Sequence, residues 1–362
     1  MSKILVAMSG GVDSSVAAAL LYEQGHELVG VTLKLYENED IGVCSEGRTC
    51  CSLTDVEDAR RVAAKIGFRH VVFSYAAEFR QDVMGRFALE YAAGRTPNPC
   101  IDCNRFIKFP RLLQRARLLG MDSIATGHYA VIEYDDKSGR WLLKKAKDKS
   151  KDQTYVLYAL TQDELAHTFF PLGGMLKYEV RQQAEQRGLV NARKPDSQDI
   201  CFVPDGDYAG FLERVMGASA PHGDFIDSKG SVIGRHKGHY RYTIGQRKGL
   251  GIGFGEPRYV ISKNAADNTV TLGSKDELYS SGLIVSEVNW ISISQPSEPL
   301  SVTVKTRYHQ PEAPAVLYPN KDESVHVRFD NPQPLAAPGQ AAVFYNGDTV
   351  VGGGIIASTT TD

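Results

Sequence analysis

A strand, a glycine-rich turn and a helix open this sequence, and that combination most narrows what the chain can fold into. Residues 3–21 read KILVAMSGGVDSSVAAALL, with an apolar run on each side of the turn. At a turn of this kind the backbone N–H groups and the dipole of the following helix favour an anion. Gly10 and Gly11 let the backbone approach a phosphate without a Cβ in the way. The turn therefore predicts a phosphate site, and an ordinary strand-to-helix turn is the alternative.

The same turn limits which phosphate chemistry is involved. It lacks the Gly-Lys-Ser/Thr ending of a Walker loop, whose lysine serves the β- and γ-phosphates. Ser9, Ser14 and Ser15 can donate hydroxyl hydrogens to a phosphate. Asp13 is an unusual neighbour for an anion unless a cation bridges them, which predicts Mg²⁺.

Stretches typical of strands and helices alternate through the first part of the chain. The expected strands are residues 4–8, 27–36, 68–75 and 122–134, and the expected helices are residues 14–25, 55–67 and 105–120, the last disturbed at Pro110. This alternation predicts an α/β fold with a doubly wound parallel sheet, in which ligands bind at the carboxyl ends of the strands.

The length of 362 residues exceeds one ordinary core, so we expect two or three domains. Glycine becomes dense after about residue 204, and short alternating stretches follow from about residue 283. Such stretches are typical of a small antiparallel barrel or sandwich. We expect a catalytic domain at 1–204, a small central mixed domain at 205–282 and a C-terminal antiparallel β-barrel at 283–362.

Two stretches without acidic residues, 103–121 and 231–255, gather basic side chains although the net charge is only −2. The first holds Arg105, Lys108, Arg111, Arg115 and Arg117, and the second holds Arg235, Lys237, Arg241, Arg247 and Lys248. Local basic stripes bind polyanions such as nucleic acid. A solvated helix face and a flexible glycine-rich loop are the respective alternatives. Tyr240 and Tyr242 could stack on bases or pack in the protein.

No apolar stretch reaches the ~18 residues of a membrane span, and the N-terminus is typical of a strand rather than a signal peptide. We therefore expect a cytoplasmic protein without a membrane partner. Six cysteines in a chain of this size do not form a disulfide framework, so each is a candidate thiol, metal ligand or catalyst.

Three cysteines carry the strongest chemical signal. Cys100 and Cys103 form a C-x-x-C within TPNPCIDCNRFIKF, and Cys201 is isolated within KPDSQDICF. A thiolate, or a persulfide carried on one, is a strong nucleophile that can replace an activated oxygen. A second cysteine can then attack the sulfur-bearing one, which releases the terminal sulfur and leaves a disulfide. We expect Arg105 and Lys108 to lower the pKa of a thiol here.

Other roles for these cysteines stay open at this point. Cys201 could be a small buried hydrophobic residue. The C-x-x-C could be half of a zinc site, although no second pair of the usual spacing follows. An iron–sulfur cluster with one open position could use Cys100, Cys103 and Cys201. Three further cysteines could be recruited, namely Cys44, Cys50 and Cys51.

The SGGVDS string resembles the pyrophosphate loop of the ATP pyrophosphatase superfamily, whose members open ATP between the α- and β-phosphates. Further motifs extend the likeness along nearly the whole chain, and together they resemble the bacterial tRNA-specific 2-thiouridylases. These motifs are CCS, TPNPCIDCNRFIKF, ATGHYA, KDQTYVLY, SQDICFVP, HKGHYRYTIGQRKGLGIG, VKTRYHQ and PGQAAVFY.

This resemblance implies an ATP-dependent reaction at the wobble uridine, position 34, of the tRNAs for Lys, Glu and Gln. ATP adenylates the C2 oxygen and sulfur replaces it, which gives 2-thiouridine, AMP and pyrophosphate. Cys201 matches the residue that carries the persulfide, loaded by an upstream sulfur-relay protein. Cys103 matches the nucleophile and the disulfide partner of Cys201. Some members carry Asp where this chain has Cys100, which leaves the associated proton-transfer role open.

The resemblance also implies the residues that bind each substrate. For ATP they are Ala7, Met8, Ser9, Gly10, Gly11, Val12, Asp13, Ser14, Ser15, Leu33, Leu35 and Gly127. For tRNA they are Asn98, Pro99 and Cys100 at the target base, together with His128, Lys151, Asp152, Gln153, Arg307, Tyr308 and Gln340.

Two other hypotheses are kept beside this one. An ATP-dependent amidating or lysine-ligating enzyme would need no thiol, so it would tolerate Cys201→Ser. A nucleotide- or metal-sensing RNA-binding protein would form no AMP. We expect a monomer, because tRNA would occupy the large basic surface.

Overall fold

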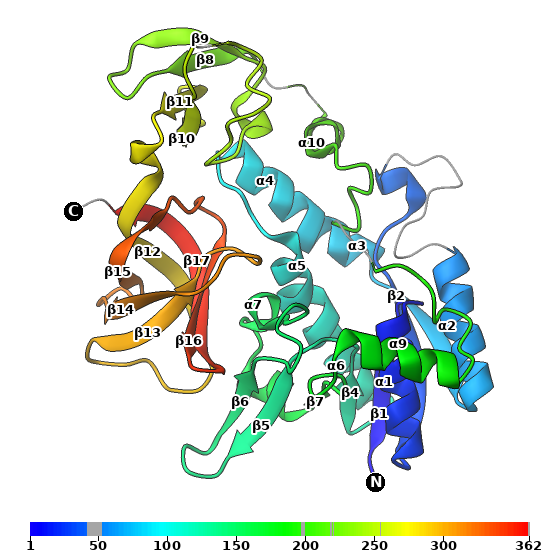
Figure 1. Ribbon diagram of the computed structural model, residues 1–362. Coiled ribbons are helices and arrows are strands. Elements are labelled where there is room, and N and C mark those ends of the chain that lie inside the picture. Colours follow the sequence, from blue (N-terminus) through cyan, green and yellow to red (C-terminus); the bar gives the residue numbers. More distant parts are fainter. Residues whose placement is uncertain (42–52, 197–199, 218, 220, 254, 361–362) are drawn as a thin grey trace.

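The computed structural model describes residues 1–41, 53–196, 200–217, 219, 221–253 and 255–360. Figure 1 shows a parallel sheet with its helices, a β-barrel beside it, and a smaller sheet above the barrel. Among the described residues, no helix is long and apolar enough to cross a membrane.

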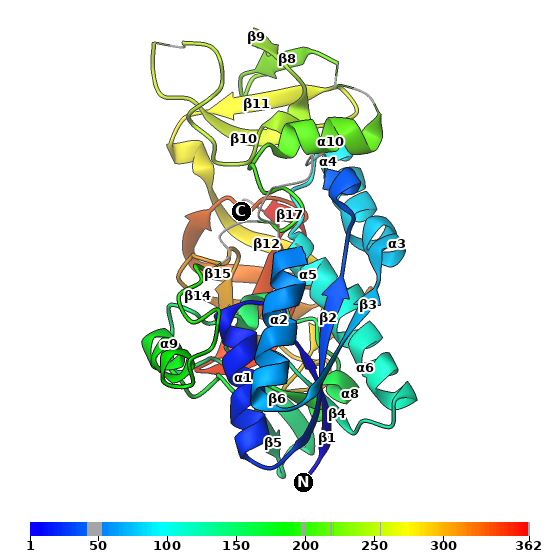
Figure 2. The same ribbon diagram turned by 90° about the vertical axis from the view of Figure 1, so that its right-hand side faces the viewer.

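The first sheet confirms the predicted doubly wound α/β fold. Its strands are all parallel, in the order β3-β2-β1-β4-β7. They span β1 (Lys3–Ala7), β2 (Glu27–Lys34), β3 (Arg69–Ser74), β4 (Ser123–Ala125) and β7 (Thr168–Phe169). Helices cover both faces (Figure 2), because side chains alternate along each strand. Ile4 and Val6 pack against α1 (Val12–Glu23), α2 (Leu53–Ile66) and α9 (Lys177–Gln186). Leu5 packs against α6 (Phe109–Leu118) on the other face.

The expectation of one strand over residues 122–134 is wrong. β4 ends at Ala125, and β5 (Val131–Asp135) pairs antiparallel with β6 (Arg140–Lys144) in a different sheet. The chain leaves the first sheet at Gly127, where a Cβ would lie 2.6 Å from the backbone nitrogen of Ser14. Residues 122–134 therefore contribute strands to two different sheets. Between the two strands, the backbone at Gly127 lies close to the backbone of Ser14.

The predicted disturbance near Pro110 is a π-helical segment. Residues 99–118 form one continuous helix made of α5 (Pro99–Asp102), η3 (Cys103–Lys108) and α6. Proline lacks an N–H group, so the turn before it cannot keep the regular α-helical bonds. A second such helix packs against the first and was not predicted from the sequence. It runs through α3 (Ala76–Phe79), the π-helical η2 (Arg80–Gly85) and α4 (Arg86–Ala92).

The central part combines helix α10 (Tyr208–Met216) with a four-stranded sheet. The strand order is β10-β11-β8-β9, with β8 (Gly223–Ile226), β9 (Val232–His236), β10 (Tyr259–Asn264) and β11 (Thr269–Gly273). Tyr240 and Tyr242 are only 4% and 6% exposed and belong to apolar clusters. The packing alternative for these two rings is therefore correct, and their faces are not offered to bases.

Six antiparallel strands close into the predicted barrel, because β12 pairs with both β15 and β17. They are β12 (Tyr279–Trp290), β13 (Leu300–Lys305), β14 (Ala313–Pro319), β15 (Val325–Pro334), β16 (Ala341–Asn346) and β17 (Thr349–Thr360). β6 joins the outer side of this sheet through the pair Lys144 and Thr349. Short helix α7 (Thr154–Leu157) lies between the barrel and the parallel sheet in Figure 1, and α8 (Gln162–Ala166) packs against both β6 and α6. One apolar cluster includes Leu5, Tyr155 and Val343, so the two sheets share a core.

Candidate active site

The loops after β1 and β4 meet at the point where the strand order of the parallel sheet reverses. β1 lies between β2 and β4, so the chain proceeds to one side of β1 first and later returns to its other side. Ligands of doubly wound folds bind in the crevice at such a point. Gly127 packs directly on the backbone of Asp13 and Ser14. The structure thus brings the predicted glycine of the second loop against the predicted phosphate turn.

The turn itself has the geometry of an anion site. Gly10 has a φ of +74°, and a Cβ there would lie 2.3 Å from the backbone oxygen of Asp55. Gly11 occupies the N-cap position of α1, and no side chain caps that helix end. The first backbone N–H groups of α1 are therefore available to an anionic ligand. Ser14 and Ser15 donate their hydroxyl hydrogens back to the Gly11 carbonyl, at 3.1 and 3.0 Å, whereas Ser9 is exposed.

Two lysines and a tyrosine that are distant in sequence contact this turn, and no sequence motif indicated them. The Lys177 ammonium lies 2.7 Å from each carboxylate oxygen of Asp13, and the Tyr129 hydroxyl donates to Asp13 at 2.8 Å. Lys194 donates to the Gly10 carbonyl at 3.2 Å and to Asp58 at 2.8 Å. No spacing in the sequence indicates these contacts, because each joins elements more than a hundred positions apart.

The remaining predicted ATP residues line the neighbouring strand ends. Ala7 ends β1, and the Met8 N–H continues the ladder by donating to the Val31 carbonyl at 2.8 Å. Leu33 and Leu35 are half-buried at the end of β2 and pack on an apolar cluster that includes Tyr36. The structure therefore places all predicted ATP residues at one edge of the parallel sheet.

Cys103 and Cys201 pack in the same apolar cluster, which also includes Tyr36 and Phe202. Cys103 is buried and Cys201 is half-buried, and both are thiols in this structure. The Tyr36 hydroxyl donates to the backbone carbonyl of Cys201 at 2.8 Å, which fixes the chain at that cysteine beside the end of β2.

The expectation of a lowered thiol pKa is wrong for Cys103. Burial raises the pKa of Cys103 to about 11, and the opposing effect of Lys108 is smaller. Arg105 is directed elsewhere, with its guanidinium 2.8 Å from Glu287 of β12. In this structure Cys103 is therefore a protonated thiol at neutral pH.

Cys100 is exposed one helical turn before Cys103. Asn98 caps this turn, because its side-chain oxygen accepts the Cys100 N–H at 3.1 Å, and Pro99 follows at the first helical position. Among the described residues, no group of three or more His, Cys, Asp or Glu side chains is arranged to hold a metal ion. The three described cysteines thus do not fit an iron–sulfur ligand set in this structure. Cys44, Cys50, Cys51 and the rest of the CCS motif lie outside the described residues.

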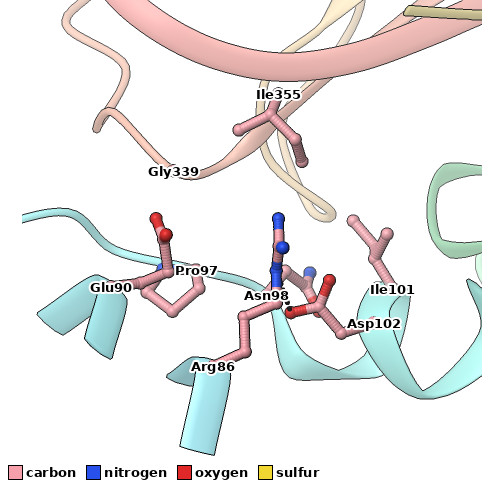
Figure 3. Close-up of a pocket in the computed structure, with 8 residues that line it drawn as sticks. All are labelled: Arg86, Glu90, Pro97, Asn98, Ile101, Asp102, Gly339 and Ile355. Atoms are coloured by element: carbon pink, nitrogen blue, oxygen red, sulfur yellow. Dashed lines mark ion pairs between the residues drawn. The ribbon is translucent and has the colours of Figure 1, made fainter. Parts of the chain in front are cut away.

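A small cavity of ≈ 10 Å³ lies under the Asn98 turn, between α4, α5 and the barrel (Figure 3). Gly339 and Ile355 bound it from the barrel side. Asp102 faces it, 3.5 Å from the Arg86 guanidinium. Burial raises the pKa of Asp102 to about 6, against the opposing effects of Arg86 and Arg105. No sequence motif indicated this acid, although it directly precedes Cys103.

The predicted tRNA residues of the first part are held largely by protein contacts. His128 packs against the rings of Phe109 and Phe170, and burial keeps its pKa well below the usual range. Asp152 accepts the Ala146 N–H at 2.7 Å, and Gln153 accepts the Tyr129 N–H at 2.8 Å. Lys151 lies 2.9 Å from Asp196.

Of the predicted residues in the barrel part, Gln340 and Tyr308 lie near the Asn98 turn, whereas Arg307 contacts the barrel part itself. Gln340 donates to the Thr96 carbonyl at 2.9 Å, and Thr96 donates to the Pro338 carbonyl at 2.7 Å. Arg307 donates to the Leu335 carbonyl at 3.0 Å. Tyr308 lies near enough to Cys100 for that thiol to contribute to its raised pKa, after burial and Asp152.

The basic stripe at 103–121 is engaged mainly within the protein. Arg115 lies 4.7 Å from the Phe73 ring centroid, and Arg117 pairs with Asp163 at 2.7 Å. In the second stripe, Arg247 and Lys248 are exposed on the central part. The second stripe is therefore the better candidate for a polyanion.

Three family models match the sequence. Residues 2–205 match the tRNA methyl transferase HUP domain, residues 209–274 the tRNA methyl transferase PRC-barrel domain, and residues 280–356 the Aminomethyltransferase beta-barrel domain. The tRNA-specific 2-thiouridylase MnmA of Acetivibrio thermocellus is 50% identical over 98% of this chain and 99% of its own length. The chain belongs to the tRNA-specific 2-thiouridylase family.

A second member of that family supports the same assignment. The tRNA-specific 2-thiouridylase MnmA of Halothermothrix orenii is 51% identical over 98% of this chain and 99% of its own length. Membership therefore covers the parallel sheet, the central part and the barrel together, as the resemblance of the motifs implied. It makes the chain an enzyme of this family.

Proposed function

We propose that this chain is an ATP-dependent tRNA-uridine 2-sulfurtransferase that acts on the wobble uridine of the tRNAs for Lys, Glu and Gln. Its membership in the 2-thiouridylase family over nearly its full length is the observation that carries this proposal. The shared position of the phosphate turn, Cys103 and Cys201 along one sheet edge supports it. We keep 1–204, 205–282 and 283–362 as the proposed catalytic, central and barrel domains.

The first step is adenylation of the base. The C2 oxygen of uridine attacks the α-phosphorus of ATP and pyrophosphate leaves. The backbone N–H groups at the start of α1 would stabilise the leaving pyrophosphate, and Asp13 would hold Mg²⁺, which would supply positive charge to offset that of the leaving group. The Asn98–Cys100 turn, reached also by Tyr308, holds the target base. The base comes from an anticodon loop, so turning it out costs only a few kcal/mol of unstacking.

The second step replaces the activated oxygen by sulfur. Cys201 carries a persulfide that an upstream sulfur-relay protein supplies. Cys103 attacks the Cys201 Sγ, and the terminal sulfur leaves and displaces AMP from C2. The products are 2-thiouridine, AMP and a Cys103–Cys201 disulfide, so no external oxidant is required. Because Cys103 is protonated in this structure, the attack needs its proton to be removed first.

The test uses metal-free protein, ATP, Mg²⁺, a persulfide donor and unmodified glutamate tRNA. Wild type is expected to release AMP and to give thiolated uridine by mass spectrometry of the digested tRNA, whereas Cys103→Ser and Cys201→Ser give no thiolated uridine. Release of neither AMP nor thiolated uridine by wild type would overturn the proposal. AMP without thiolation would leave adenylation standing and make a cluster-based sulfur route the better explanation. Thiolation by Cys201→Ser would contradict the persulfide role.

A further inference from the structure

Two of the three described cysteines lie in one turn of the same helix. Cys100 and Cys103 are three positions apart at the start of the helix over residues 99–118, and the Cys103 N–H donates to the Cys100 and Pro99 carbonyls. Residues at this spacing have Cβ atoms about 5–6 Å apart, whereas a disulfide needs about 4 Å. A small movement of the first helical turn would therefore join the two sulfurs.

The two sulfurs also affect each other in the structure. Burial raises the pKa of the Cys103 thiol to about 11, and charge on Cys100 adds to that increase. The turn that carries Cys100 has only local support, because Asn98 caps it by accepting the Cys100 N–H and Pro99 has no N–H to donate. The structure thus places an exposed thiol beside a buried one, on the end of a helix that can move.

The three thiols differ in how well a dissolved reductant can reach them. Cys100 is exposed, Cys103 is buried and Cys201 is half-buried. Cys103 and Cys201 pack in the same apolar cluster, so a disulfide between them would form inside that cluster. Reduction of a disulfide requires a thiolate to reach one of its sulfurs, and burial slows that approach. A disulfide that includes Cys100 would instead lie at the surface.

We propose that Cys100 is the resolving cysteine of this enzyme. The proposal rests on the proposed sulfur-transfer step, which ends with a Cys103–Cys201 disulfide, and adds how the enzyme returns to its starting state. The Cys100 thiolate attacks the Cys103 Sγ, the Cys103–Cys201 bond breaks, and the Cys201 Sγ leaves as a thiolate. The proton lost by Cys100 passes through solvent to Cys201. Cys201 is then a thiol again and can accept the next persulfide.

A dissolved dithiol completes the cycle at the surface. One of its thiolates attacks the exposed Cys100 Sγ, and Cys103 leaves and takes up a proton. Its second thiolate attacks the first sulfur of the dithiol, which releases Cys100 as a thiol. The dithiol supplies both electrons and ends as its own cyclic disulfide, so no other co-reactant is needed.

The experiment follows the cysteines of the full chain through one turnover. Protein loaded by a persulfide donor is mixed with ATP, Mg²⁺ and unmodified glutamate tRNA without a reductant, quenched in acid, alkylated and mapped by mass spectrometry. Wild type is expected to thiolate its tRNA and to hold a Cys100–Cys103 disulfide, with Cys201 recovered as an alkylated thiol. Cys100→Ser and Cys100→Asp lack the thiol but differ in charge, and both are expected to keep the Cys103–Cys201 disulfide.

Addition of dithiothreitol then measures how fast the enzyme recovers. The ratio of the second-turnover rate to the first-turnover rate is expected to fall about tenfold in both Cys100 variants, because a neighbouring thiol attacks faster than a dissolved one. This ratio removes any effect of the variants on binding of the target base. Tyr308→Phe is the matched control, since Tyr308 lies near Cys100 and its substitution keeps all three thiols. Its ratio is expected to equal that of wild type.

A Cys103–Cys201 disulfide that persists in wild type, with equal ratios in wild type and both variants, would overturn the proposal. A fall of the ratio in only one variant would overturn it as well, because both lack the thiol. Thiolation that leaves Cys103 as a thiol would contradict this proposal and the proposed sulfur step together. Wild type that thiolates no tRNA would instead contradict the proposed function itself.

Discussion

The hydroxyl of Tyr36 holds the backbone carbonyl of Cys201 at 2.8 Å, across 165 positions of the chain. Tyr36 follows β2 directly, and β2 runs beside the strand that leads into the phosphate turn. The cysteine proposed to carry sulfur is thus fixed to the same sheet edge as the proposed nucleotide site. Removing this hydrogen bond therefore tests whether Tyr36 positions Cys201 relative to the proposed nucleotide site.

Tyr36→Phe is expected to lower the rate of tRNA thiolation about fivefold while the affinity for ATP stays unchanged. A hydrogen bond of this kind is worth about 1 kcal/mol, and its loss lets the Cys201 backbone move. Single-turnover thiolation and nucleotide calorimetry measure the two effects. Tyr75→Phe is the control, because Tyr75 lies in the same cluster but its hydroxyl makes only a 3.5 Å contact with Arg111. Equal rates for both variants would contradict a positioning role of Tyr36.

The thiols of Cys100 and Cys103 are expected to react with an alkylating agent at different rates. Cys100 is exposed and should react first with iodoacetamide, whereas Cys103 is buried with a pKa raised to about 11. Only the thiolate reacts, so the rate at Cys103 should rise about tenfold for each pH unit between 7 and 9. Lys108→Gln should slow it further, because Lys108 opposes the pKa increase. A rate at Cys103 that levels off below pH 9 would be incompatible with this environment.

Asp102→Asn is expected to stabilise the protein near neutral pH. Burial raises the pKa of Asp102 from 3.8 to about 6, so the folded state favours the protonated acid. The contribution of this group to stability is thus complete below about pH 4 and is lost as the pH rises through 6. The variant should raise the free energy of unfolding at pH 7.5 by about 1–3 kcal/mol and make no gain at pH 4.

Urea unfolding at both pH values checks this, with the exposed Asp276→Asn as the control. A loss of stability in Asp102→Asn at pH 7.5 would mean that the ion pair with Arg86 outweighs the cost of burying the carboxylate.

Gly127→Ala is expected to weaken ATP binding by about tenfold or more. An added Cβ would lie 2.6 Å from the Ser14 nitrogen, which is backbone at the start of α1, so the two loops must separate. Gly174→Ala is matched to it, because a Cβ there meets nothing within 4 Å. Equilibrium dialysis measures the dissociation constant for ATP of each of the two variants, and the comparison tests this prediction. Unchanged binding in Gly127→Ala would show that the contact of the loops does not shape the nucleotide site.

Local sequence patterns were sufficient to predict most helices and strands of the parallel sheet. The predictions that failed depend on contacts between residues far apart in the sequence. The glycine-rich turn and the alternation of strands and helices were sufficient for the parallel sheet, because both are local consequences of side-chain periodicity and backbone freedom. The strand expected over 122–134 failed because Gly127 meets the N-terminus of α1, a contact that no local pattern encodes. Likewise, the sequence shows the positive charge of Arg105 but not that this charge pairs with Glu287.

In the candidate site too, residues within short motifs could be predicted from the sequence, whereas residues identified only by long-range contacts could not. The cysteines and the turn could be found in the sequence, since each stands in a short motif of unusual composition. Lys177 and Asp102 carry no such motif, and only their placement beside Asp13 and Arg86 makes them candidates. The pKa of Cys103 was mispredicted because sequence shows neighbouring charges but not the depth of burial.

The shared apolar core has a consequence for how the chain is made. Leu5 of the first strand packs in one cluster with Val343 and Val350, which are synthesised long after it. Likewise, β6 pairs with β17 through Thr349, which is synthesised much later than β6. Until those later residues are made, an apolar surface and an unpaired strand edge stay open to other chains, the situation in which nascent proteins aggregate or recruit chaperones.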